Sequence, residues 1–225
     1  MVANGFFNNS NINGAFKDAP TSKPNIESCP CFKNNMQKVR APDCPVEDHK
    51  LIKLTNGPDN FICAAKIVVP DFNRTVILTQ VPDLSNTQNV EDFWRMVFQE
   101  NIISVIVAVM PLEVTLQQIF PLLVGTYSNH GKMFINKKVE SAVGVTEYSL
   151  EILPDGCSNS LFTTVYHLQN WKQKKGLDNV GGLVATIEKV MKVNENMLLM
   201  SMNGTGRAGT MLTLFTAMIQ VQKGK

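Results

Sequence analysis

Two kinds of hydrophobic pattern follow one another along this chain, and together they predict a mixture of strands and helices. Short apolar or alternating segments predict strands, over residues 60–67, 75–79, 102–109, 132–136, 143–153, 160–168 and 197–202. Apolar residues three and four positions apart predict amphipathic helices over residues 89–100 and 180–193, and a third helix is predicted over 209–221. The residues 154–156, Pro-Asp-Gly, favour a hairpin between two of the strands.

This succession of elements predicts one α/β (α+β) domain over residues 29–225, built on a central twisted sheet. A chain of 225 residues is long enough to bury a sizeable core. Residues 1–28 are polar, and the segment up to Pro24 is rich in Asn, Ser, Gly and Pro without periodicity. That composition predicts a flexible N-terminal tail.

Composition and charge exclude several classes of function. With 44% hydrophobic and 18% charged residues, the chain is typical of a soluble globular protein. The net charge of +2, without a basic run interleaved with aromatic residues, argues against nucleic-acid binding. The longest apolar stretch, residues 102–112, is shorter than the ~20 residues that cross a bilayer, so we expect no membrane span. The N-terminus lacks the apolar core of a signal peptide, and we expect a cytoplasmic or nuclear protein.

The cysteines and histidines predict neither a disulfide framework nor a metal site. The cysteine count is odd and the spacing irregular, at Cys29, Cys31, Cys44, Cys63 and Cys157. Cys29 and Cys31 are too close in sequence for the Cys-x-x-Cys of zinc or redox sites. The histidines lack metal-ligand spacing, at His49, His130 and His167. We therefore expect unpaired thiols, no metal and no cofactor.

A glycine-rich loop follows the last predicted strand, in the segment 197–210, Met-Leu-Leu-Met-Ser-Met-Asn-Gly-Thr-Gly-Arg-Ala-Gly-Thr. A loop that leads from a strand into a helix points backbone N–H groups and the positive helix end at one spot, so it can cradle a phosphate. The loop also contains Gly-x-Gly-x-x-Gly, which is found in dinucleotide sites. That alternative is disfavoured, because a Rossmann unit needs an acidic residue on a second strand ~20 positions further on, and the sequence ends at Lys225.

The same loop resembles the signature loop of the protein tyrosine phosphatases, His-Cys-x5-Arg-Ser/Thr-Gly. Other segments resemble that family in the same order. They are Lys33-Asn-Asn-Met36 for Lys-Asn-Arg-Tyr, Thr79-Gln-Val-Pro82 for Thr-Gln-Gly-Pro, the helix segment Val90–Val97, Ile119-Phe-Pro121 for Tyr-Trp-Pro, and Trp171-Lys-Gln173 for Trp-Pro-Asp. The resemblance covers residues 33–225. It implies the family's highly twisted mixed sheet flanked by helices, truncated at the C-terminus because further helices normally follow the signature helix.

What the resemblance implies for the chemistry is loss of catalysis. In the family, a cysteine thiolate attacks phosphotyrosine, and an aspartic acid protonates the leaving phenol. Here Ser201 replaces the cysteine, Gln173 the aspartic acid, Met200 the histidine and Ala208 the hydroxyl residue after the arginine. A serine hydroxyl needs a neighbouring base to attack, and the amide of Gln173 has no proton to give, which by itself costs ~10²–10⁴-fold in rate.

We therefore expect a pseudophosphatase that binds phosphorylated protein ligands or acts as a scaffold in phosphotyrosine signalling. The alternatives are an active or residually active phosphatase that uses Ser201, and a scaffold whose pocket is vestigial. The resemblance assigns phosphate binding to the signature loop, namely Ser201, Met202, Asn203, Gly204, Thr205, Gly206 and Arg207. It assigns the substrate rim to Met36, Lys38 and Trp171.

Several charged side chains near the expected site have two interpretations. Arg207 either binds an oxyanion through charge-assisted hydrogen bonds or pairs with an internal carboxylate such as Glu113. Lys38 and Arg40 either make the rim basic, which would favour acidic or multiply phosphorylated ligands, or are ordinary solvated charges. A further basic segment, with Lys172, Lys174 and Lys175, is expected to be a solvated face.

Overall fold

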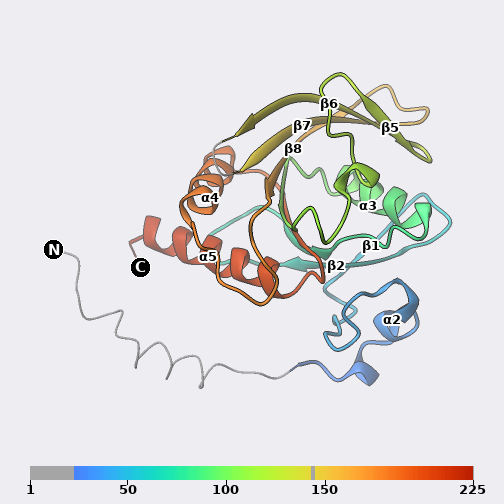
Figure 1. Ribbon diagram of the computed structural model, residues 1–225. Coiled ribbons are helices and arrows are strands. Elements are labelled where there is room, and N and C mark those ends of the chain that lie inside the picture. The colour runs from blue at the N-terminus through green and yellow to red at the C-terminus, as the bar shows by residue number, and fades with distance from the viewer. Residues whose placement is uncertain (1–22, 143–144, 225) are drawn as a thin grey trace.

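The computed structural model describes residues 23–142 and 145–224 (Figure 1). Most of the predicted tail 1–28 lies outside the described residues, as do residues 143 and 144 of the predicted strand 143–153. Within the described part, Ile26–Ser28 form a short 3-10 helix, η1, whose first turn is capped by the side chain of Asn25. The tail and the domain boundary at residue 29 remain predictions.

A nine-stranded sheet forms the centre of the described part, in the order β1-β2-β3-β9-β4-β8-β7-β6-β5. Its strands are β1 (Leu51–Lys53), β2 (Phe61–Ile67), β3 (Val76–Gln80), β4 (Ser104–Ala108), β5 (Tyr127–His130), β6 (Met133–Ala142), β7 (Thr146–Pro154), β8 (Leu161–Leu168) and β9 (Met197–Ser201). The neighbours β3, β9, β4 and β8 are parallel, and the pairs outside them are antiparallel. The sheet is therefore mixed, with a parallel centre.

Helices cover both faces of this parallel centre. The α-helices are α2 (Pro30–Lys33), α3 (Thr87–Gln99), α4 (Gly181–Val193) and α5 (Gly206–Gln222), and two further 3-10 helices are η2 (Met36–Lys38) and η3 (Leu116–Gln118). Leu198 and Met200 of β9 belong to the hydrophobic cluster that contains Trp94 of α3. The alternate residues Met197 and Leu199 belong to the cluster built on α4 and α5. Since both faces are buried, β4 and β9 are buried at every position and almost continuously apolar instead of alternating.

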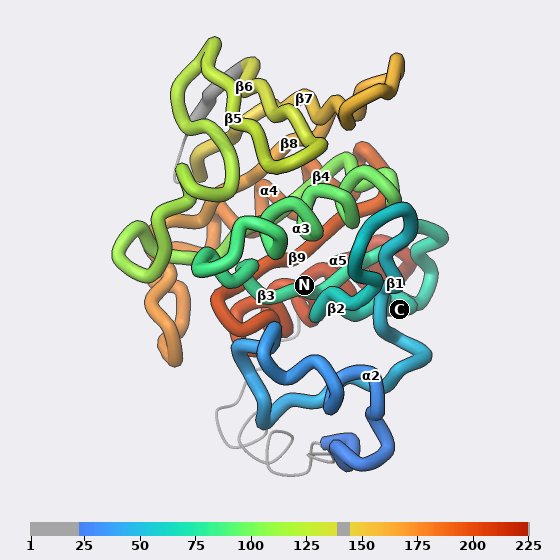
Figure 2. The backbone as a smooth tube through the Cα atoms, turned by 90° about the vertical axis from the view of Figure 1, so that its right-hand side faces the viewer, coloured from blue at the N-terminus to red at the C-terminus, as the bar shows by residue number. Residues whose placement is uncertain are grey.

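The antiparallel strands β5–β8 form a meander that extends the sheet away from this centre. Figure 2 shows the β5–β6 hairpin and α2 at opposite ends of the molecule. The β7–β8 hairpin pairs Ile152 with Leu161 and turns through Pro154–Gly156, as the turn residues predicted.

The sequence-based prediction of an α/β fold with a central mixed sheet flanked by helices is confirmed. Two strands were not predicted, and both lie at the edges of the sheet. β1 has only three residues, too few to show a period, and β5 is polar and half exposed. The helix predicted from residue 209 begins at Gly206, because the first turn of α5 is formed by the glycine-rich loop itself.

Candidate functional site

The carboxyl ends of the parallel strands meet at one edge of the sheet. Ser201, the last residue of β9, is level with Gln80 of β3 and Ala108 of β4. In open α/β sheets, ligands bind outside the carboxyl ends of the strands. A pocket of about 340 Å³ lies there, and its lining comes from the loops after β8 and β9 and the start of α5: Trp171, Gln173, Lys174, Lys175, Ser201, Met202, Asn203, Thr205, Gly206, Arg207 and Thr210.

The loop between β9 and α5 is held closely against the end of β3. The carbonyl of Ser201 accepts hydrogen bonds from the N–H groups of Val81 and Gly204, both at 3.1 Å. Gly204 has φ +70°, and a Cβ at this position would lie 2.7 Å from the backbone nitrogen of Gln80. Only glycine fits such a backbone at such a distance.

The first turn of α5 directs a backbone donor toward the side chain of residue 201. The N–H of Ala208 donates to the Oγ of Ser201 at 3.3 Å, and Ser201 is only 2% exposed. Gly206 and Arg207 lie in the first turn of α5, where N–H groups have no intrahelical acceptor. The positive end of the helix dipole points the same way. Of the seven residues predicted to bind phosphate, all but Gly204 line the pocket.

Arg207 makes the internal ion pair that was one of its two predicted roles. Its Nη1 and Nη2 donate to the two carboxylate oxygens of Glu113 at 2.7 and 2.9 Å, and Nη1 also donates to the carbonyl of Trp171 at 2.8 Å. A guanidinium has five N–H donors. The contacts that the structure describes leave the Nε–H and one Nη2–H without a protein acceptor. Pairing with Glu113 therefore does not exclude a contact between Arg207 and an oxyanion in the pocket.

The Arg207–Glu113 pair predicts a pH dependence of stability. Burial raises the pKa of Glu113. Hydrogen bonds from Arg207 and the Met110 N–H, together with the charge of Arg207, outweigh burial, so the pKa is below its usual 4.5. A carboxyl whose pKa is lowered on folding stabilises the protein above its unfolded pKa and loses that effect as the pH falls through the folded value. We expect Glu113→Gln to be less stable than the native chain at pH 7, with the difference shrinking below about pH 4.5.

Denaturant unfolding of both chains between pH 7 and 3 measures this difference. Glu47→Gln is a matched control, because Glu47 forms a surface ion pair with Lys50, and such pairs contribute ~0–1 kcal/mol. A stability difference for Glu113→Gln that does not change with pH would contradict the assignment.

The substituted catalytic positions are found in two kinds of environment. Met200 and Ala208 are fully buried in the two hydrophobic clusters, on opposite faces of the sheet. Gln173 is exposed and lines the pocket together with Ser201. No histidine, cysteine or carboxylate is among the described residues that line this pocket. His167, the buried histidine of β8, bonds to the carbonyl of Val109 instead, and burial lowers its pKa.

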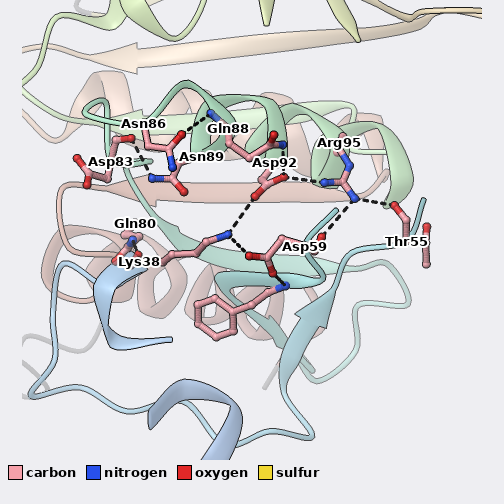
Figure 3. Close-up of polar contacts among 11 residues, drawn as sticks. Lys38, Thr55, Asp59, Gln80, Asp83, Asn86, Gln88, Asn89, Asp92 and Arg95 are labelled. Carbon is pink, nitrogen blue, oxygen red and sulfur yellow. Dashed lines mark hydrogen bonds and ion pairs between the residues drawn. The ribbon is translucent and has the colours of Figure 1, made fainter. Parts of the chain in front are cut away.

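Lys38 and Met36, two predicted rim residues, do not line the pocket. The Nζ of Lys38 lies 2.6 Å from a carboxylate oxygen of Asp59 and 3.3 Å from one of Asp92, as Figure 3 shows. Asp92 is 2% exposed and also binds Arg95 at 2.6 Å. Burial raises the pKa of Asp59, but the hydrogen bonds from Lys38 and the backbone outweigh it and the net pKa is lowered. Lys38 is therefore paired with carboxylates and is not an ordinary solvated charge, and its place on the substrate rim stays a prediction.

Arg40 also serves to hold the chain together. Its guanidinium donates to the carbonyls of Val81 and Pro82 at 2.8 and 2.9 Å. The side chain of Gln80 bridges the same segment, since its Nε2 donates to the carbonyl of Lys38 and its Oε1 accepts from the Arg40 N–H. The role of Gln80 was missed from sequence. The available signal was a polar residue at the end of an otherwise apolar strand.

The third predicted rim residue, Trp171, anchors the loop after β8. Its side chain is 3% exposed and packs in the cluster with α4 and α5. Its Nε1 donates to the carbonyl of Lys175 at 2.9 Å. The residues between them, Lys172 to Lys174, are exposed, so Trp171 fixes the base of a loop whose side chains face solvent and the pocket.

The described residues offer neither a metal site nor a membrane-spanning helix. Within residues 23–142 and 145–224, no three His, Cys, Asp or Glu side chains are grouped so that they could hold a metal ion. All five thiols are unpaired. None of the helices described combines the length and the hydrophobicity that a bilayer crossing requires.

Comparison with known proteins identifies the class. The protein-tyrosine phosphatase family model matches residues 35–225, and the chain belongs to this family. It is 73% identical over 226 residues to "Putative tyrosine-protein phosphatase C15H7.3" of Caenorhabditis elegans, across 100% of this chain and 57% of that protein. It is 24% identical over 221 residues to "Putative tyrosine-protein phosphatase B0280.11" of the same organism, across 93% of this chain and 50% of that protein. The chain thus spans about half the length of these relatives.

Proposed function

We propose that this domain is a catalytically inactive member of its family, which binds phosphotyrosine-containing segments of other proteins in the pocket beside Ser201. One observation supports this best. The glycine-rich loop and Arg207 line a pocket whose described lining has no thiol, no imidazole and no carboxyl group.

The loss of catalysis follows from the groups around Ser201. Activation of a serine needs a base within hydrogen-bond reach, and the only contact described for its Oγ is the Ala208 N–H, which donates to it. Gln173, on the pocket wall, carries an amide that cannot protonate a leaving phenolate. Attack by Ser201 therefore lacks a base, and departure of the phenolate lacks the family's carboxylic acid.

We expect phosphate binding to be retained because the loop carries no negative charge at position 201. The family's thiolate would place a negative charge beside the phosphate, and Ser201 is neutral. The donors of the first turn of α5 and the two remaining N–H groups of Arg207 favour an anion. A volume of about 340 Å³ is within the range of small-ligand pockets.

A calorimetric titration with a phosphotyrosine peptide and its unphosphorylated twin tests the proposal. We expect heat from the phosphorylated peptide alone. Ser201→Asp should weaken binding at least ~10-fold, because a carboxylate at 4 Å from a phosphate costs ~1 kcal/mol in water and several times that in a partly buried site. The matched variant Ser201→Ala, of similar size but neutral, should bind within a few-fold of the native chain.

Arg207→Ala is a second variant, and its fold has to be checked by thermal melting because Glu113 loses its partner. Equal binding of both peptides, or of neither, would leave the pocket vestigial and would favour a scaffold that uses other surfaces. An active phosphatase remains the second candidate, favoured by the family and by the names of both relatives. Turnover abolished by Ser201→Ala would establish it, and no turnover at high protein concentration would exclude it.

The proposed setting is the cytoplasm or nucleus, with a phosphorylated protein as the partner. Support comes from the five unpaired thiols, because extracellular chains of this size commonly use their cysteines in disulfides.

A further inference from the structure

The loop Trp171–Lys175 forms a fixed turn beside the signature loop, residues 201–207. Arg207 donates to the carbonyl of Trp171, the Nε1 of Trp171 donates to the carbonyl of Lys175, and the N–H of Lys175 donates to the carbonyl of Lys172 at 3.3 Å. Lys174 has φ +58°, in the left-handed region, which non-glycine residues adopt when surrounding contacts impose it. The backbone of this loop is therefore ordered by contacts with the site itself.

Two of its lysines belong to the wall of the pocket. Lys174 and Lys175 line the cavity that contains Ser201, whereas Lys172 does not. Their side chains are exposed, and the ion pairs described for the chain include neither of them. Asp178, the nearest carboxylate along the loop, does not line the pocket.

The pocket consequently carries positive charge that no described protein group balances. The charge of Arg207 is neutralised by Glu113, so the unbalanced positive charge comes from Lys174 and Lys175. The rest of the wall is neutral, with Asn203, Thr205 and Thr210 among its polar side chains. A concave wall of one sign of charge concentrates oppositely charged ligands, and a solvated lysine far from the pocket would not have this effect.

We propose that Lys174 and Lys175 form a second anionic subsite, which selects phosphotyrosine segments that carry another negative group close to the phosphotyrosine. This inference rests on the proposed function and specifies its ligand class. The shared chemistry is an anion within reach of the two ammonium groups, supplied either by a carboxylate side chain or by a second phosphate. Lysine acts here as a point charge on a flexible stem, so it accommodates either source.

Three peptides of one sequence test the inference in calorimetric titrations at low and physiological salt. One has a single phosphotyrosine with neutral neighbours, one has acidic neighbours, and one has a second phosphate. We expect the native chain to bind the two acidic peptides at least roughly 5-fold more tightly than the neutral one, as expected for about 1 kcal/mol from two exposed charge pairs. The preference should be weaker at physiological than at low salt.

Lys174→Gln with Lys175→Gln should remove this preference, measured as the ratio of the affinities for the acidic and neutral phosphopeptides, because a loss of affinity common to all three peptides cancels in that ratio. The turn should persist, because its hydrogen bonds use the backbone of these residues. Lys172→Gln, a lysine of the same loop outside the pocket, is the matched control and should keep the preference. Equal affinity of the native chain for all three phosphopeptides would overturn the subsite and leave the proposed function intact. Absence of binding to every phosphopeptide would overturn both.

Discussion

Phosphotyrosine hydrolysis is the expected result of combining Ser201→Cys with Gln173→Asp. The side chain of residue 201 accepts a hydrogen bond from the Ala208 N–H, in the first turn of α5. A thiol in such a place has its pKa lowered from ~8.5 to ~3.5–7.5, so the variant supplies a thiolate at neutral pH. Position 173 lines the same pocket, and a carboxyl group there restores a proton donor for the leaving phenolate.

Phosphopeptide turnover by the native chain, both single variants and the double variant measures this effect. We expect no turnover by the native chain, slow turnover by Ser201→Cys, and a further ~10²–10⁴-fold increase when the acid is added. Gln173→Asp by itself is the control and should remain inactive, since it lacks a nucleophile. A double variant no faster than Ser201→Cys would mean that position 173 does not reach the leaving group.

The thiol of Ser201→Cys also reports on the cradle directly. Its alkylation rate by iodoacetamide, followed as a function of pH, gives the thiol pKa. The native chain is the control, because its exposed thiols, Cys31 and Cys157, also react. The pKa of Cys31 is raised by its hydrogen bond with Asp48, and burial raises that of Cys63 to about 12. A pKa near the ordinary value for the new thiol would contradict both the cradle and the proposal that it binds phosphate.

Gly204→Ala is expected to cause the largest loss of stability of any single methyl addition in the signature loop. The added Cβ would lie 2.7 and 2.8 Å from backbone atoms of Gln80 and Thr79, and the φ of +70° disfavours any side chain. Overpacking costs ~1–3 kcal/mol and the left-handed conformation ~1–2 kcal/mol. We expect a loss of roughly 2–5 kcal/mol, because the atoms that it meets belong to β3 and cannot rotate away.

Denaturant unfolding compares this variant with Gly209→Ala. Gly209 lies in α5, and apart from its chain neighbours and the helix's own backbone no atom is within 4 Å of the position that its Cβ would take. Alanine there should be neutral or stabilise by ~0.5–1 kcal/mol, since glycine is unfavourable in a helix. Equal stability of Gly204→Ala and the native chain would show that the loop does not have the described close contact with β3.

Elements with a local sequence signal could be predicted from the sequence, whereas strands at the edges of the sheet could not. Strand β9 was predicted over 197–202 and is observed over Met197–Ser201, because its apolar run and the glycines after it are local signals. Strand β5 was not predicted, since its four residues are polar. Its strand conformation comes from pairing with β6, and no pattern within the segment itself indicates it.

The chemistry of the candidate site could likewise be predicted only in part from the sequence. Ser201 has no thiolate and Gln173 has no acidic proton. Both facts depend only on the covalent structure of the side chains, so the sequence by itself determined them. The sequence left open the partners of the charged side chains. Arg207 and Glu113 are 94 residues apart, and Lys38 and Asp92 are 54 apart.

Only the tertiary structure decided these pairings, because the order of the strands in the sheet brings the distant segments together. Four loops meet at the carboxyl edge of β3, β9, β4 and β8, and from them come the Gly204 contact with β3, the carboxylate for Arg207 and the lysines of the pocket wall. Local periodicity determines which segments become strands and helices. The packing of their apolar faces determines which side chains meet, and therefore which charges are compensated and which are left for a ligand.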